Sequence, residues 1–450
     1  MKKRIEDITW LKLDNAATIY PSTISRKYIT MFRLTITLNE EIDNDILALA
    51  LNNVLKRFPT FSFTLKQGFF WCYFEKIKDK PIISKDTKNP MVRIDFDKNN
   101  KYLFRIRTFK NRIALEVFHA LTDGTGALKF LLTLTEEYLR LKYKVKPEYT
   151  DYVLDPNEEA KQYEIEDAFL RVTSSKGNLV HEHTAYHPKG TKLESNMISI
   201  ITGVLDSTEL KKISKKYNTT ITEFLCSLLI YSIQELKREQ NIKDKKEIKV
   251  SIPINLRNMY DVKTLRNFSS YINVGIKPDH DYSLEEIIYV VQKQIKEMNN
   301  YEFLNAKISG NVKLMKNYFI RRIPMFVKKH IMSFIEAKMG DGYITTSISN
   351  LGNIELPKNM KKYVTDMNFI LGKSRGKPSC VACIGYNNKI YITFSSIIKE
   401  TDQERIFFKT LANMGLEVYI ESNRWWVWNV KTVMLLLLHI LRNVLYVEKK

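Results

Sequence analysis

The sequence predicts an α/β protein built from two similar halves, and three observations lead to that prediction. Strand-like and helix-like patterns alternate both before and after an irregular stretch at residues 144–190. A chain of 450 residues has material for two or three domains with cores of their own. The sequence contains neither the glycine fingerprint of a dinucleotide fold nor a phosphate-binding loop, which argues against nucleotide-dependent redox or kinase chemistry.

The N-terminal half opens with a strand at residues 27–38, which are rich in Ile, Thr, Met and Phe. A helix follows at 43–57, where apolar residues recur at near-helical spacing before Pro59. An amphipathic helix at 127–143 closes the half. Between the two helices we expect short strands at 61–65, 69–75, 92–96, 103–109 and 112–118.

The C-terminal half repeats the alternation after the polar, proline-containing crossover, beginning with a strand at 197–205. Thr220 with Glu223, and Ser283 with Glu286, form capping boxes that predict helices to about residues 237 and 298. The other expected elements are strands at 247–252, 271–276, 343–349, 366–371, 380–386 and 389–396, and a last helix at 402–418.

The chain is therefore divided into an N-terminal half at 1–185, a C-terminal half at 186–424 and an apolar tail at 425–450. The tail begins with a cluster of tryptophans, but its uninterrupted apolar part is about half of the roughly 20 residues that a spanning helix needs. Residues 425–447 form either an interfacial helix that touches a membrane or a packed terminal helix.

The net charge of +21 favours polyanionic partners. The Lys and Arg residues are nevertheless spread along the chain without a nucleic-acid-binding motif, so no nucleic-acid partner is expected. The N-terminus lacks the apolar stretch of a signal peptide, and four cysteines make no disulfide framework. We expect a cytoplasmic protein, with membrane association through the tail as the open alternative.

One segment carries recognisable chemistry. A strand delivers His119, a tight turn places Asp123 four residues later, and Gly124 and Gly126 let the chain reverse into a helix. Histidine can take a proton from a weak nucleophile such as an alcohol as it attacks a carbonyl, and then return the proton to the leaving group. A nearby carboxylate can hold the loop without touching the substrate.

This HxxxDG segment, HALTDGTG, resembles the signature of the chloramphenicol acetyltransferase-like superfamily, which includes alcohol acetyltransferases and condensation domains. The opening residues 10–21 are similar to bacterial alcohol acetyltransferase-like members. Other similar segments contain Arg57 before the second strand, Arg257 in 252–257, Arg266 in 264–268, and Ser349-Asn350 in 345–352. The resemblance extends from about residue 10 to residue 424.

The resemblance implies two acetyltransferase-like domains, each a mixed sheet with flanking helices, and an active-site tunnel between them. His119 would be the general base, Asp123 a structural residue paired with Arg57, and Gly124 the residue that keeps the turn open. Ser349 or Asn350 would donate to the developing oxyanion. A segment near 343–372 would cross from the second domain to the first.

The implied activity is transfer of an acyl group, acetyl by preference, from coenzyme A to a hydroxyl of a small-molecule acceptor, with no permanently bound cofactor. Phe118 stands where condensation domains carry a first histidine, which favours a free-standing acyltransferase. Two alternatives stay open: a condensation-type enzyme that uses a carrier protein, and a catalytically silent binding protein.

We expect no metal site. The three histidines His181, His183 and His187 lie in the crossover without matching carboxylates or cysteines. Cys380 and Cys383 form a lone CxxC in a strand-like run and are expected to pack inside.

Overall fold

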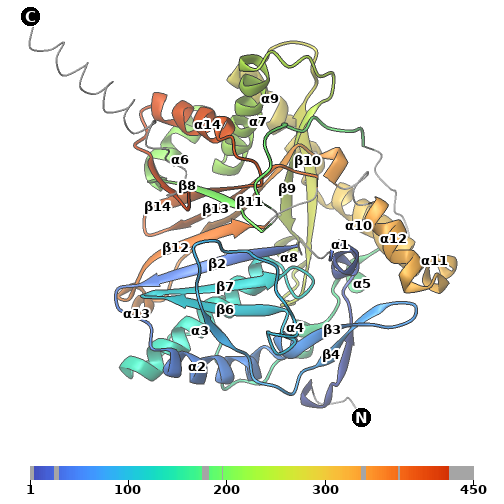
Figure 1. The fold of residues 1–450 in the computed structure, drawn as a ribbon, viewed down its shortest axis with the longest axis vertical. Coiled ribbons are helices and arrows are strands. Elements are labelled where there is room, and N and C mark those ends of the chain that lie inside the picture. The colour runs from blue at the N-terminus through green and yellow to red at the C-terminus, as the bar shows by residue number, and fades with distance from the viewer. Residues whose placement is uncertain are drawn as a thin grey trace, which may run out of the picture.

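The computed structural model describes residues 5–24, 30–174, 182–194, 196–335, 341–372 and 376–424. In this part of the chain, two sheet-based halves lie against each other (Figure 1). A five-stranded sheet forms the centre of the N-terminal half, a seven-stranded sheet forms the centre of the C-terminal half, and a third sheet has three strands. The prediction of an α/β protein with two mixed sheets and flanking helices is confirmed.

The five-stranded sheet has the order β12-β2-β7-β6-β5. Helices α2 (Asn44–Arg57) and α3 (Gly124–Tyr143) pack their apolar side chains into the same core as its strands. Asp43 caps α2 by accepting from the backbone N–H groups of Asp45 and Ile46. The strands of this sheet are β2 (Met31–Leu38), β5 (Ile83–Lys85), β6 (Phe104–Phe109), β7 (Arg112–Phe118) and β12 (Val364–Leu371).

The small sheet, β1-β4-β3, contains β1 (Trp10–Lys12), β3 (Phe63–Gln67) and β4 (Cys72–Lys76). The strand expected at 92–96 is wrong, because that segment has no strand pairing. Met91 adopts a positive φ of 63°, and the Val92 carbonyl accepts from the Arg105 guanidinium at 2.5 Å. The alternating sequence pattern at 92–96 therefore belongs to an irregular segment, and a side-chain hydrogen bond holds it in place.

The seven-stranded sheet has the order β10-β9-β11-β13-β14-β8-β15 and combines parallel and antiparallel pairs. Both expected capping boxes are present, at the starts of α7 (Ile221–Glu239) and α9 (Leu284–Met298). The strands are β8 (Ser199–Asp206), β9 (Ile248–Asn255), β10 (Ser269–Ile276), β11 (Thr346–Asn353), β13 (Ser379–Tyr386), β14 (Lys389–Ser396) and β15 (Tyr419–Ser422).

Strand β12 joins the two halves. It pairs with β2 over seven residues of the N-terminal sheet, although it follows β11 in the sequence. Its other contacts reach back to β13 and β14: the Tyr386 hydroxyl donates to the Val364 carbonyl at 3.0 Å, and the Thr393 hydroxyl donates to Asn368 at 2.9 Å. The expected crossing of a segment within 343–372 is confirmed.

The sequence did not predict several helices, above all a run along one outer edge of the molecule (Figure 1). That run consists of α10 (Tyr301–Lys316), α11 (Tyr318–Arg322) and α12 (Met325–Ile335). The other helices that were not predicted are α1 (Tyr20–Thr23), α4 (Gln162–Ile165), α5 (Phe169–Val172), α6 (Ser207–Lys216), α8 (Arg257–Tyr260) and α13 (Lys358–Lys361). The last helix, expected at 402–418, is present as α14 (Asp402–Asn413).

The proposed boundaries at 185 and 424 stay predictions, and the tail at 425–450 lies outside the described residues. Among the residues that are described, no helix combines the length and the apolarity that crossing a bilayer requires.

Candidate functional site

The HxxxDG loop connects the end of β7 to the start of α3. The apolar strand β7 ends at Phe118, and a tight turn follows in which the Leu121 N–H donates to the Phe118 carbonyl at 2.9 Å. Asp123 then caps α3 by accepting from the Gly126 N–H at 3.1 Å. His119 therefore lies between a rigid strand and a capped helix, where its backbone has little freedom.

The imidazole of His119 is held through its Nδ1 atom, which lies 3.2 Å from Oδ1 of Asn267. The Asn267 amide nitrogen donates to the Asp14 carboxylate and to the Ala120 carbonyl, both at 3.3 Å. The amide oxygen must then face the ring, so Nδ1 carries the proton and donates it. The lone pair of the neutral ring is left on Nε2, which is the atom that can accept a proton.

Aromatic rings surround the imidazole. Tyr20 stacks on it with ring centroids 4.8 Å apart, and Phe32 meets it edge-on at 5.0 Å. Burial lowers the pKa of His119 below the ordinary value of 6.5, against smaller raising effects from Asp123 and Asn267. The residue as a whole is only half-buried and keeps some surface open to solvent. A base that is neutral near pH 7 can accept a proton from a substrate that comes within hydrogen-bond reach of it.

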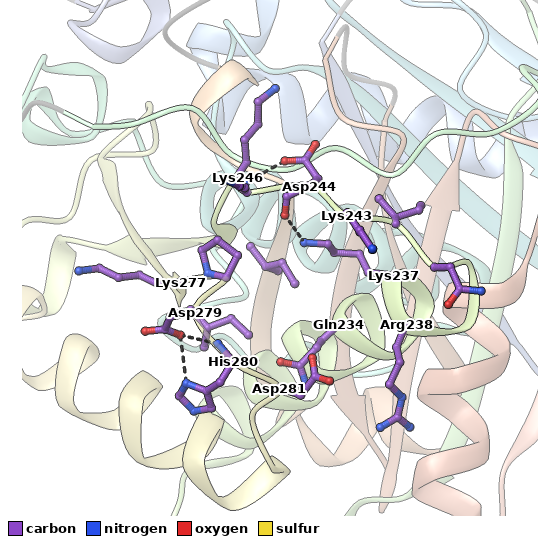
Figure 2. Close-up of a pocket in the computed structure, with 16 residues that line it drawn as sticks. Gln234, Lys237, Arg238, Lys243, Asp244, Lys246, Lys277, Asp279, His280 and Asp281 are labelled. Carbon is purple, nitrogen blue, oxygen red and sulfur yellow. Dashed lines mark hydrogen bonds and ion pairs between the residues drawn. The ribbon is translucent and has the colours of Figure 1, made fainter.

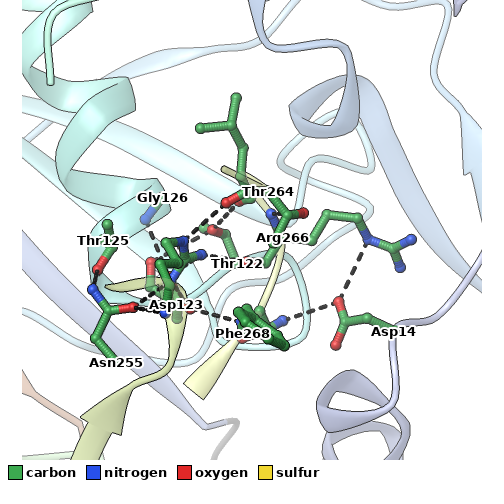
Figure 3. Close-up of polar contacts among 12 residues, drawn as sticks. Asp14, Thr122, Asp123, Thr125, Gly126, Asn255, Thr264, Arg266 and Phe268 are labelled. Carbon is green, nitrogen blue, oxygen red and sulfur yellow. Dashed lines mark hydrogen bonds and ion pairs between the residues drawn. The ribbon is translucent and has the colours of Figure 1, made fainter. Parts of the chain in front are cut away.

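Asp123 does not point its charge at a substrate. Its carboxylate pairs with both terminal nitrogens of Arg257, at 2.8 and 3.1 Å, and accepts from the Phe268 N–H at 2.9 Å. Figure 3 shows Asp123 between two of its backbone donors, Gly126 at the start of α3 and Phe268 just before β10. Burial raises the pKa of Asp123, but Arg257 and the backbone donors outweigh it and hold the pKa below 3.8.

The expected pairing of Asp123 with Arg57 is wrong. Arg57 forms a buried two-bond ion pair with Glu164 instead, at 2.6 and 2.7 Å. Glu164 lies on α4 in the crossover, so Arg57 fixes the crossover to the end of α2. Arg257 is the first residue of α8, just after β9, and ties the HxxxDG loop to the C-terminal half.

Arg266 supports the hydrogen-bond network that holds the imidazole. Its guanidinium donates to the Lys12 carbonyl at 2.6 Å and lies 3.5 Å from the Asp14 carboxylate (Figure 3). Asp14 in turn accepts from Asn267, so the chain of contacts continues to His119. Arg266 therefore has a supporting position, and it does not touch the imidazole itself.

Asn267, Asp14 and Tyr20 were not selected from the sequence. Asn267 stands within the Arg266-to-Phe268 stretch that carried the resemblance, and Asp14 and Tyr20 stand in the similar opening segment. The similarity of those segments was the only indication in the sequence that these residues could belong to the site. The contacts between them join residues more than 140 positions apart, which no spacing in a single sequence discloses.

Gly124, Ser349 and Asn350 lie where the two halves meet. A Cβ atom at Gly124 would lie 3.0 Å from Cδ2 of Leu351 on β11. Asn350 donates to the Thr222 hydroxyl at 3.1 Å and accepts from the Gly352 N–H at 2.9 Å. In the described part of the chain, no partner is seen for the Ser349 hydroxyl.

Two pockets in the C-terminal half are lined by residues far from this loop along the chain. The larger, of about 520 Å³, opens between the end of α7 and the end of β10 (Figure 2). Lys237 and Lys277 line it, together with the exposed His280, whose ring nitrogen lies 3.2 Å from Asp279. Neither pocket includes His119, so the tunnel between the halves stays a prediction.

The residues singled out for metal binding have other surroundings. Cys380 and Cys383 are free thiols buried on β13, as their strand-like pattern predicted. His181 lies outside the described residues. Among those described, no group of three or more His, Cys, Asp or Glu side chains could hold a metal ion.

Neither the protein-family models nor the curated protein sequences contain a match to this chain. The chain nevertheless shares its overall fold with solved structures that include an O-acetyltransferase, an epimerization domain and a condensation domain. TRI101 of F. sporotrichioides, in complex with coenzyme A and T-2, is similar with a TM-score of 0.62 and 10% identity, over 92% of this chain and 99% of that chain.

Two further solved structures illustrate the range of this fold. The trichothecene 15-O-acetyltransferase TRI3 of Fusarium sporotrichioides has a TM-score of 0.56 and 11% identity, over 89% of this chain and 93% of that chain. A variant of the starter condensation domain of rhizomide synthetase RzmA, in complex with C8-CoA, has a TM-score of 0.57 and 12% identity, over 89% of this chain and 94% of that chain. At such identities the likeness establishes the fold alone, and the reaction has to be argued from the site.

Proposed function

We propose that this protein is an acyltransferase that moves an acyl group from a coenzyme A thioester to a hydroxyl, with His119 as the general base. One observation carries the proposal: Nδ1 of His119 is committed to Asn267, which leaves a basic Nε2 on a residue that is only half-buried.

In the proposed reaction, Nε2 of His119 takes the acceptor's hydroxyl proton while the oxygen attacks the thioester carbonyl. A C–O bond forms and the carbonyl electrons move onto oxygen, giving a tetrahedral oxyanion. When the oxyanion collapses, the C–S bond breaks, and the departing thiolate takes the proton from the imidazolium. The products are an ester and the free thiol, and His119 returns to its starting state.

Ser349 is the better candidate to donate to the oxyanion. It pairs with Ala382 of β13, which belongs to the apolar core against which Leu351 packs, and the Leu351 side chain reaches Gly124. Asn350 is turned toward Thr222 and already makes two hydrogen bonds. A single placed donor of this kind contributes roughly 3–4 kcal/mol to transition-state stabilisation.

Coenzyme A is the proposed donor for two reasons. The net charge of +21 favours a phosphate-bearing molecule. In addition, proteins of the same fold have been solved in complex with coenzyme A and with C8-CoA. Acetyl is the acyl group that we propose first, and a small-molecule alcohol is the acceptor.

The second candidate is a condensation-type reaction on acyl groups bound to a carrier protein, which the likeness to a condensation domain favours. Thiol release from acetyl- and octanoyl-coenzyme A, measured against a panel of alcohols and amines, separates the candidates. Release that depends on an alcohol supports the proposal. No turnover without an acylated carrier protein supports the second candidate, and identical behaviour of wild type and His119→Ala in every assay indicates a silent binding protein.

A further inference from the structure

One outer edge of the molecule exposes an unusual set of large apolar side chains. It is formed by α11, α12 and the turn between β3 and β4, which lie side by side in Figure 1. Phe319 is 79% exposed and Phe69 is 67% exposed. We call this surface the aromatic edge, and it consists of Phe69, Trp71, Tyr318, Phe319, Phe326 and Ile331.

Backbone contacts make these parts one surface although they lie about 250 residues apart in the sequence. The Met325 N–H at the start of α12 donates to the Phe69 carbonyl at 2.7 Å. The Lys328 ammonium donates to the Phe70 carbonyl at 2.8 Å. The ring of Phe69 and the ring of Phe326 therefore belong to segments that are fastened together.

The aromatic edge and the helix α10 that precedes it have a strongly one-sided charge. Residues 303–335 contain seven Lys and Arg residues and no Asp or Glu, and the β3–β4 turn at 65–72 also lacks acidic residues. Lys313, Lys316, Arg321 and Arg322 are all exposed. Arg322 lies 3.9 Å from the centre of the Tyr318 ring, so a positive charge is placed directly beside an exposed aromatic group.

We propose that the aromatic edge docks on the surface of a lipid bilayer that contains anionic lipid. Aromatic side chains settle at the boundary between headgroups and acyl chains, where their rings leave water and their polar atoms stay hydrated. Lysine and arginine beside them are attracted by anionic headgroups. Both features occur here in segments that are joined by hydrogen bonds, and no residue of the aromatic edge belongs to the tail at 425–450.

The shape and charge of the surface argue against other occupants. Neither of the two pockets described above is lined by a residue of the aromatic edge, so neither offers it a groove for a peptide. A second copy docked through the same face would bring like charges together. Exposed aliphatic residues such as Ile331 and Leu314 contribute nothing to base stacking, which makes a single-stranded nucleic acid a poorer fit.

The test is binding of the full chain to vesicles, measured by co-sedimentation. The vesicles contain equal parts of phosphatidylglycerol and phosphatidylcholine, or phosphatidylcholine alone. We expect binding to the anionic vesicles that weakens about tenfold in Phe319→Ala/Phe326→Ala, since two insertable rings are lost. Arg321→Gln/Lys313→Gln should weaken binding to the anionic vesicles and reduce its dependence on salt.

Matched control variants distinguish binding through this surface from non-specific adsorption to vesicles. Tyr289→Ala/Tyr419→Ala removes two rings of similar exposure, at 69% and 63%, from other parts of the molecule. Lys211→Gln/Lys215→Gln removes two exposed charges from α6. Both controls should bind as wild type does. Absence of vesicle binding, equal binding by Phe319→Ala/Phe326→Ala, or binding to a single-stranded oligonucleotide without binding to vesicles would each overturn the proposal.

Discussion

Replacing Arg257 by alanine should destabilise the fold strongly, because this side chain joins the HxxxDG loop to the C-terminal half. Its guanidinium donates to both carboxylate oxygens of Asp123, to the backbone carbonyls of Thr264 and Arg266, and to the side chain of Asn255. The side chains of Arg257 and Asp123 are only 7% and 6% exposed. The substitution would leave the Asp123 carboxylate buried with its two backbone donors alone.

Breaking a buried ion pair on one side costs about 3–5 kcal/mol, whereas an exposed pair contributes at most about 1 kcal/mol. The pair of Arg405 with Glu239 provides the comparison, since its bond of 2.7 Å is as short but both side chains are 47% exposed. Urea unfolding should therefore show a free-energy loss of about 3 kcal/mol or more for Arg257→Ala and about 1 kcal/mol or less for Arg405→Ala.

The pH dependence of unfolding provides a second readout. The folded-state pKa of Asp123 lies below 3.8, so its paired carboxylate contributes stability above that pH, and the contribution is lost as the pH falls through the lowered pKa. The difference in unfolding free energy between wild type and Arg257→Ala should accordingly become smaller as the pH is lowered. A loss for Arg257→Ala no larger than that for Arg405→Ala, or a gap independent of pH, would refute the reasoning.

Three further predictions concern the same loop. Asn267→Leu removes the acceptor of the Nδ1 proton of His119, so kcat/KM should fall about tenfold or more. The ¹⁵N spectrum of His119 should then show a larger fraction of the Nε2–H tautomer, and an unchanged spectrum would contradict this prediction. Gly126→Ala should lower the unfolding free energy by about 1–3 kcal/mol, because its Cβ would lie 2.1 Å from Thr122 Oγ1 and 2.4 Å from the Leu265 carbonyl oxygen; Gly124→Ala should have the smaller effect, and the reverse order would disprove the assignment. Because burial lowers the pKa of His119, kcat/KM for acyl transfer should stay high as the pH falls to 6.5 and decline only at lower pH; a midpoint above 6.5 would count against an enclosed neutral base.

Much of the fold could be predicted because local signals and tertiary structure agree. The capping boxes at Thr220 and Ser283 fix helix starts through contacts within four residues, and both are present. The helices α10–α12 were missed because they cover an outer edge, where Gly310, Pro324 and the exposed aromatic residues blur the helical period. Their packing against the rest of the chain, rather than their sequence pattern, specifies them.

The site could be predicted only where it is continuous in the sequence. His119 and Asp123 belong to one strand–turn–helix unit, which a short motif can describe. The choice between Arg57 and Arg257 as the partner of Asp123 depends on how two distant strands and the crossover meet, and both arginines are buried and paired. Local pattern could not separate them, and the same holds for Asn267.

The most direct test of the account is the rate of acyl transfer in His119→Ala beside wild type and His280→Ala, which alters an exposed histidine of the Lys-lined pocket. We predict that His119→Ala keeps its circular dichroism spectrum and loses at least about a hundredfold in kcat/KM, while His280→Ala equals wild type. Undiminished transfer by a folded His119→Ala protein would contradict the role of this imidazole as the base.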